Sequence, residues 1–92
     1  MRSISETPLV NLSQEDITMF RRDRQDFVMR EARARQNRDY KSAYRFNNAI
    51  FMIGMSLVAQ GDSNEMDESI LRTSMDNSLF YTYKLGGFEI WN

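Results

Sequence analysis

The sequence predicts an α+β fold in which two to three helices pack with a C-terminal β-hairpin. Three observations predict it: a capped amphipathic pattern after residue 12, a long apolar run in the middle, and a glycine pair between two β-prone runs near the end. The 92 residues suit a single domain. We expect an extended arm over residues 1–12, helical segments over 13–76 and the hairpin over 78–92.

The first helix is expected to begin after Ser13. Its hydroxyl can accept a backbone N–H, and Asp16 follows three residues later, which gives a short variant of the capping box. The residues that follow place apolar side chains near one stripe, with Arg24 between them: Ile17, Phe20, Phe27 and Val28. The stripe predicts that this helix packs one face against the core.

A break is expected near residues 36–39. A helix running without a break to Gly61 would be about 48 residues and about 70 Å long, which is too long for a compact domain of this size. Asparagine and aspartate favour caps and turns, and Asn37 and Asp39 supply them. A single long helix acting as the strut of a dimer is the alternative.

The second helix is expected over residues 39–60, with Gly61 as its C-cap. Its apolar run, residues 49–59, is 11 residues long, whereas a membrane-spanning helix needs about 20. We therefore expect a buried helix and no membrane span. Gly54 within the run is expected to allow another helix to approach closely.

A third helix is expected after a turn in which Asp62, Ser63 or Asn64 provides the cap, and it is expected to end by residue 76 or 77. The hairpin is expected to fold about the glycine pair at 86–87, because that register places Lys84 opposite Glu89.

Enzymatic activity, a cofactor and a metal site are not expected. The chain has no cysteine and no histidine, so the usual nucleophile–base pairs and the commonest metal ligands are missing. The acidic residues near position 65 are explained by helix capping and lack the ligand spacing of a calcium loop. The start of the chain lacks the apolar core of a signal peptide, and we expect a cytoplasmic protein.

Charge is unevenly distributed along the chain. Residues 21–45 hold nine basic and four acidic residues, a net of +5, and the rest of the chain carries −6. An amphipathic helix would place much of the basic run on its outer face. The candidate partner-binding residues there are Arg30, Arg33, Arg35, Arg38, Lys41 and Arg45. Pairing with carboxylates three or four residues away, such as Asp26 and Glu31, is the alternative use of these arginines.

The leading functional hypothesis is a small protein-binding regulator or inhibitor, forming a homo-oligomer. It would use the basic helix face for an acidic partner, with Phe80 or Trp91 of the hairpin as an aromatic anchor. Trp91 could equally be a core residue of a hairpin buried on both sides. A small nucleic-acid-binding regulator is the rival, with Tyr40 and Tyr44 available for stacking. A well-packed monomer with no such partner also stays open.

Overall fold

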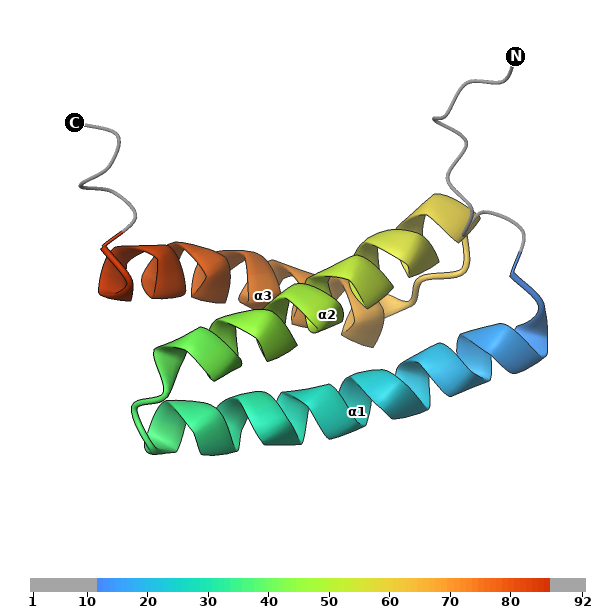
Figure 1. Ribbon diagram of the computed structural model, residues 1–92. Coiled ribbons are helices and arrows are strands. Elements are labelled where there is room, and N and C mark those ends of the chain that lie inside the picture. Colours follow the sequence, from blue (N-terminus) through green and yellow to red (C-terminus); the bar gives the residue numbers. More distant parts are fainter. Residues whose placement is uncertain (1–11, 87–92) are drawn as a thin grey trace, which may run out of the picture.

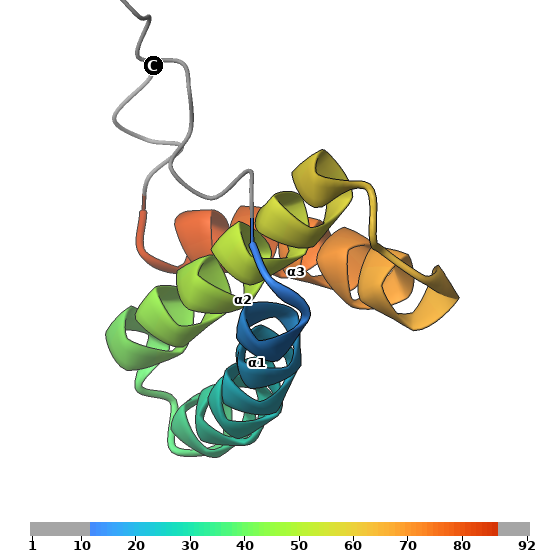
Figure 2. The same ribbon diagram turned by 90° about the vertical axis from the view of Figure 1, so that its right-hand side faces the viewer.

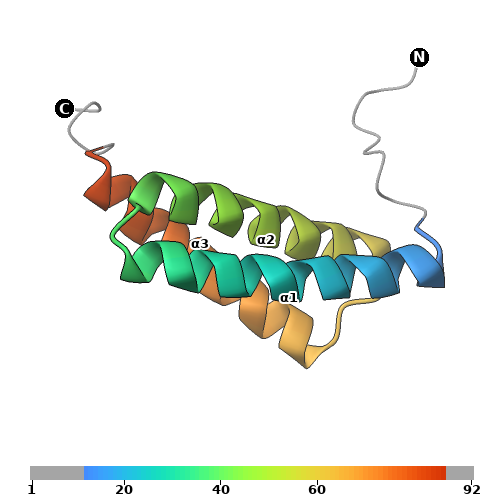
Figure 3. The ribbon, with the colours of Figure 1, turned by 60° about the horizontal axis from the view of Figure 1, so that its bottom comes forward.

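The computed structural model describes residues 12–86, which form three helices (Figure 1). Helix α1 spans Gln14–Gln36, α2 spans Tyr40–Gln60 and α3 spans Glu65–Lys84. Helix α2 packs against both of the others, while the backbones of α1 and α3 do not approach each other closely. Figure 2 shows α1 and α3 against different sides of α2, and in Figure 3 α3 passes behind α1 at an angle to it. Long side chains, described below, bridge α1 and α3.

The α+β prediction is wrong for the part of the chain that the structure describes, because residues 12–86 contain no strand. Helix α3 does not end at residue 76 or 77. It continues to Lys84, through residues predicted to form the first strand of the hairpin. The physical reason lies at Tyr81, which is fully buried and packs its ring against those of Tyr40 and Tyr44 on α2. This packing overrides the β propensity of the segment. The second expected strand lies outside the described residues.

The predicted ends of the first two helices and the predicted start of the third are confirmed. Ser13 caps α1 and forms the capping box with Asp16. The break near residues 36–39 is present, and Asp39 caps α2 by accepting the Ser42 N–H. Gly61 ends α2 with φ 85°, in the left-handed region that favours glycine. The predicted arm lies outside the described residues except for its last residue, Leu12.

The buried apolar residues form a narrow seam along α2. They are Ile17, Ala34, Ala43, Ile50, Leu57, Leu71 and Tyr81. Gly54 permits the close approach that the sequence predicted: a Cβ atom at this position would lie 3.0 Å from Cδ1 of Leu71. No helix in the range 12–86 is long and apolar enough to cross a membrane.

Candidate functional site

The six basic residues of the predicted binding surface are all exposed and gather at one end of the molecule. Arg30, Arg33 and Arg35 belong to the last turns of α1, Arg38 lies in the turn, and Lys41 and Arg45 begin α2. The short connection between the two helices brings these segments together, at the lower left of Figure 1.

Two of the six side chains are paired within the molecule. Arg30 Nε lies 2.8 Å from Asp26 Oδ2, and Arg35 Nη1 lies 3.5 Å from Glu31 Oε2. Within residues 12–86 the other four make no ion pair and no side-chain hydrogen bond. We call these four the basic end: Arg33, Arg38, Lys41 and Arg45. Ion pairs within the chain thus engage two of the six basic side chains, and the four residues of the basic end carry charges without an ion pair in residues 12–86.

One carboxylate lies among the basic end. Asp39 accepts a hydrogen bond from the Ser42 N–H at 3.2 Å. Hydrogen bonding from the Ser42 side chain, then from its backbone N–H, followed by the positive charges of Arg45 and Lys41, holds the pKa of Asp39 below its ordinary value. With Asp39 counted beside the four cations of the basic end, the net charge of this surface is +3 at neutral pH.

Arg38 has an unusual backbone conformation. Its φ is 59°, the only positive value at a non-glycine residue in the described chain. The left-handed region costs an L-residue with a large side chain roughly 1–2 kcal/mol relative to glycine. Stability of the turn therefore does not explain why an arginine stands at its tip.

The helix dipoles separate the cations into two groups. Arg33 and Arg35 lie in the last turn of α1, where the negative end of the dipole favours them. Lys41 lies in the first turn of α2, where the dipole disfavours a cation, and that turn contains no acidic residue. Helix stabilisation thus accounts for the cations on α1 and not for Lys41.

Phe80 is part of an aromatic cluster instead of a hairpin. Its ring centroid lies 5.3 Å from that of Tyr81 and 6.0 Å from that of Tyr40. Lys84 Nζ lies 5.6 Å from the Phe80 centroid, within cation–π range. The ring remains 40% exposed, so part of its surface is available beside the basic end. Trp91, the other predicted anchor, lies outside the described residues.

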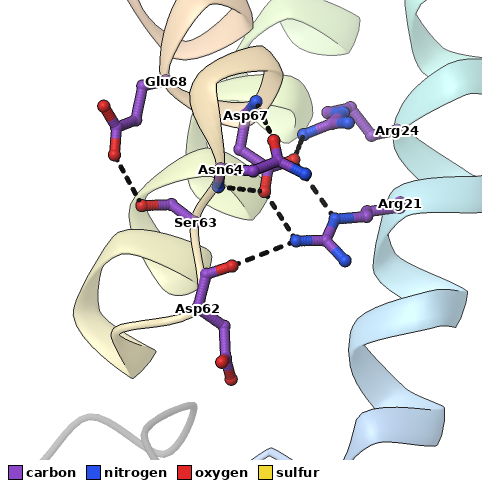
Figure 4. A network of polar contacts seen from close by, with 7 residues as sticks. All are labelled: Arg21, Arg24, Asp62, Ser63, Asn64, Asp67 and Glu68. Atoms are coloured by element: carbon purple, nitrogen blue, oxygen red, sulfur yellow. Dashed lines mark hydrogen bonds and ion pairs between the residues drawn. The ribbon is translucent and has the colours of Figure 1, made fainter.

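The sequence did not predict the buried ionic cluster around Asp67 (Figure 4). The Asp67 side chain is 1% exposed and accepts bonds from Arg24 Nη1 at 2.7 Å, from Arg21 Nη2 at 2.7 Å and from the Asn64 N–H at 3.0 Å. Burial alone would raise the pKa of Asp67, but these bonds outweigh it and lower the pKa to about 2. The cluster ties α1 to the start of α3, which is a structural task. Its one sequence signal was Arg24 within an apolar stripe.

A groove of about 290 Å³ separates α1 from α3. Its two charged residues, Glu31 and Arg35, are bonded to each other, and Glu31 also accepts the Tyr81 hydroxyl. Asn47 at the groove donates to the Ser74 carbonyl at 2.8 Å, while its Oδ1 has no hydrogen-bond partner among the described residues. The charged groups of the groove are therefore already bonded within the molecule. Its other polar groups are amides and hydroxyls, which have modest reactivity.

Comparisons with protein-family models, curated proteins and solved structures find no match. In the described range no group of three or more potential ligands is placed to hold a metal ion. The function must therefore be argued from the charge and exposure of the basic end.

Proposed function

We propose that the chain is a non-catalytic binding protein, a small regulator or inhibitor, whose basic end contacts an acidic surface on a partner protein. The observation that carries the proposal is the gathering of four exposed cations that have no ion pair within residues 12–86. By contrast, Arg24 and Arg30 have carboxylate partners at 2.7 and 2.8 Å.

The basic end carries features that oppose stability. Four like charges at one end repel one another, Arg38 adopts a left-handed backbone, and Lys41 lies at the positive end of a helix dipole. Unfavourable backbone conformations and unfavourable charge placements that coincide in one place are typical of functional surfaces. The carboxylates of an acidic partner would attract these cations and offset the repulsion among them.

A protein partner is favoured over a nucleic acid by the surroundings of the basic end. Along the exposed side of α2, the cations are followed by Met52 and Met55, which are 55% and 44% exposed. Exposed methionines adapt to protein surfaces, whereas a phosphate backbone offers them nothing apolar to pack against. Tyr40 and Tyr44 already pack their rings against Tyr81, so neither is open on both faces for base stacking.

The test is a binding titration followed by fluorescence anisotropy. The probes are a labelled glutamate-rich peptide, duplex DNA and single-stranded RNA, each at low and high salt. The test variant carries Arg38→Gln and Arg45→Gln. The matched control carries Arg22→Gln and Arg72→Gln, which remove the same charge from exposed arginines that have no ion pair in the described chain and lie apart from the basic end.

We expect the peptide to bind in a salt-sensitive manner and the test variant to lose about tenfold or more in affinity, since each lost charge contact is worth about 1 kcal/mol. The control should stay within about twofold of the unmodified chain, which is the scale of a distant, screened charge. Equal losses in both variants, or no peptide binding at low salt, would refute the proposal. If DNA or RNA binds more tightly than the peptide and in a salt-sensitive manner, the basic end would instead be the surface of a nucleic-acid-binding regulator.

A further inference from the structure

The outward side of α2 carries a continuous stripe of exposed residues. Six positions spaced alternately four and three residues apart fall on one helix face: Lys41, Arg45, Asn48, Met52, Met55 and Ala59. All six are exposed. We call this the outer face of α2. It is basic at its amino end and apolar in its centre, and neither α1 nor α3 covers it.

We propose that a second copy of the chain packs antiparallel along the outer face of α2, about a twofold axis between Met52 and Met55. The inference rests on the proposed function, because it identifies the acidic surface met by Lys41 and Arg45 as that of the second copy. Arg33 and Arg38 lie outside the contact and stay available to another partner.

The apolar centre of the face is self-complementary. A twofold axis at this point places Met52 of one copy against Met55 of the other, twice. Both methionines are about half exposed in the single chain, and a helix packed against them would remove the sulfur-bearing side chains from water.

The charged ends of the face are also self-complementary. Arg45 lies about 13 Å along the helix from the axis, at a rise of 1.5 Å per residue. Beyond the other end of α2, where the left-handed Gly61 stops the helix, the next acidic residues are Asp62, which follows Gly61, and Glu65, which begins α3. Antiparallel packing therefore brings Arg45 of one copy to Asp62 of the other, and Lys41 towards Glu65.

Both acidic side chains are available for this contact. Asp62 and Glu65 are exposed. The Asp62 backbone carbonyl accepts a bond from Arg21 Nη2 at 3.1 Å (Figure 4). The Asp62 carboxylate forms no ion pair with that arginine, although its charge helps to raise the pKa of Arg21. Within residues 12–86 neither carboxylate has an ion pair.

The helix dipoles point to the same arrangement. The last turn of α2 has no basic residue, so the negative end of its dipole is not compensated by a cation of that turn. In an antiparallel pair, Lys41 and Arg45 of one copy lie beside that end of the other. The cations that α2 disfavours at its own amino end thus gain a favourable position on the second copy.

The test is sedimentation equilibrium of the full chain at rising concentration, at low and high salt. A contact limited to one helix face belongs to the small interface class, so we expect the mass to rise from one chain towards two over roughly 5–500 μM at low salt. High salt should weaken the association. Arg45→Glu alone and Asp62→Arg alone should each abolish it, because each change opposes two like charges in the dimer. The exposed residue Arg72 lies on α3, so Arg72→Glu serves as the control and should leave the association unchanged.

A mixture of the two single variants guards against misfolding as the explanation. In an equal mixture, the glutamate introduced at position 45 of one chain would meet the arginine introduced at position 62 of the other. The native Asp62 and Arg45 would meet at the second contact, so the association should return. A mixture that stays monomeric, or an unmodified chain that stays monomeric throughout the range, would overturn the inference. If the double variant Arg38→Gln, Arg45→Gln still loses peptide binding while the chain is monomeric, the proposed function survives without the dimer.

Discussion

Replacing Asp67 by asparagine tests whether the buried ionic cluster holds α1 against the start of α3. The change keeps the size of the side chain and part of its hydrogen bonding, but it removes the negative charge between Arg21 and Arg24. Arg24 is only 6% exposed and would become a buried cation without a counter-charge. Asp26→Asn is the matched control, because it removes the same group from a pair whose side chains are 58% and 57% exposed.

The size of the effect follows from the geometry. Lowering the pKa of Asp67 from 3.8 to about 2 corresponds to about 2.5 kcal/mol of folding free energy at neutral pH, at 1.36 kcal/mol per pKa unit. Leaving a buried charge unpaired brings the expected loss for Asp67→Asn to about 3–5 kcal/mol. The exposed pair of Asp26 and Arg30 should contribute only about 0.3–0.5 kcal/mol.

The sign of the pH dependence is fixed by the direction of the pKa shift. Since the folded protein lowers the pKa of Asp67, the stabilisation is complete above the unfolded value of 3.8 and is lost as the pH falls towards 2. The difference in unfolding free energy between the unmodified chain and Asp67→Asn should therefore be largest near neutral pH and shrink over that interval.

The assay is urea unfolding followed by far-UV circular dichroism, because urea leaves the ion pairs unscreened. Should Asp67→Asn be unfolded in water, adding Arg24→Met to it removes the more deeply buried of the two cations and should recover part of the loss, since only the partly exposed Arg21 is then left without its carboxylate partner. Equal unfolding free energies for Asp67→Asn and Asp26→Asn, or a loss that does not change between neutral and acidic pH, would refute the reasoning.

Three further predictions concern single positions. Gly54→Ala should destabilise the fold by about 1–3 kcal/mol in urea unfolding, because its Cβ would lie 3.1 Å from the Leu71 Cβ. A gain of about 1 kcal/mol, the helix-propensity advantage of alanine over glycine, would contradict the close approach of α2 and α3. Tyr81→Phe should cost about 1–3 kcal/mol by removing a donor from the buried Glu31 carboxylate. Burial and this bond also raise the pKa of Tyr81, so the unmodified chain should lose stability as the pH rises above about 10, and a variant with the same alkaline loss would refute the role of the hydroxyl. Arg38→Gly should stabilise the turn by up to about 1 kcal/mol in urea unfolding, because glycine adopts the left-handed backbone without strain, yet it should weaken binding of the glutamate-rich peptide. A variant in which stability and peptide affinity both fall, or both rise, would contradict a binding role for Arg38.

The ends of α1 and α2 could be predicted because their chemistry is local. A cap bonds to a backbone group three residues away, as Ser13 does with Asp16, so the signal and its partner lie in the same short stretch. The break after Gln36 and the left-handed Gly61 follow from the same short-range preferences. Such contacts depend little on how the rest of the chain is arranged.

The end of α3 could not be predicted from local propensity. Phenylalanine, tyrosine and threonine in residues 78–84 favour strands, yet the segment is helical. Helical spacing aligns Tyr81 with Ser74 and Ser78, and the Asn47 amide on α2 donates to the Ser74 carbonyl and the Ser78 hydroxyl. These bonds and the packing of Tyr81 on the rings of Tyr40 and Tyr44 join α3 to residues about 30 or more positions earlier. A reading of the local pattern does not include such contacts.

The candidate site was only partly predictable for the same reason. Helical spacing identified Asp26 and Glu31 as partners of nearby arginines, and the structure pairs them with Arg30 and Arg35. The sequence explains Asp67 by helix capping, in which it does take part, but its pairing with Arg24 joins residues 43 positions apart. The arginine within the apolar stripe of α1 was the available signal, because a charge on a buried face requires a partner.

The central claim is that the basic end meets a partner instead of being only a solvated helix face. The most direct measurement is a titration of the isotope-labelled chain with the glutamate-rich peptide, followed by two-dimensional ¹H–¹⁵N NMR. We predict that the amide shifts change at residues 33–45 and recede at high salt. Changes confined to the groove between α1 and α3, or shifts at Arg22 and Arg72 as large as those at Arg38 and Arg45, would contradict the claim.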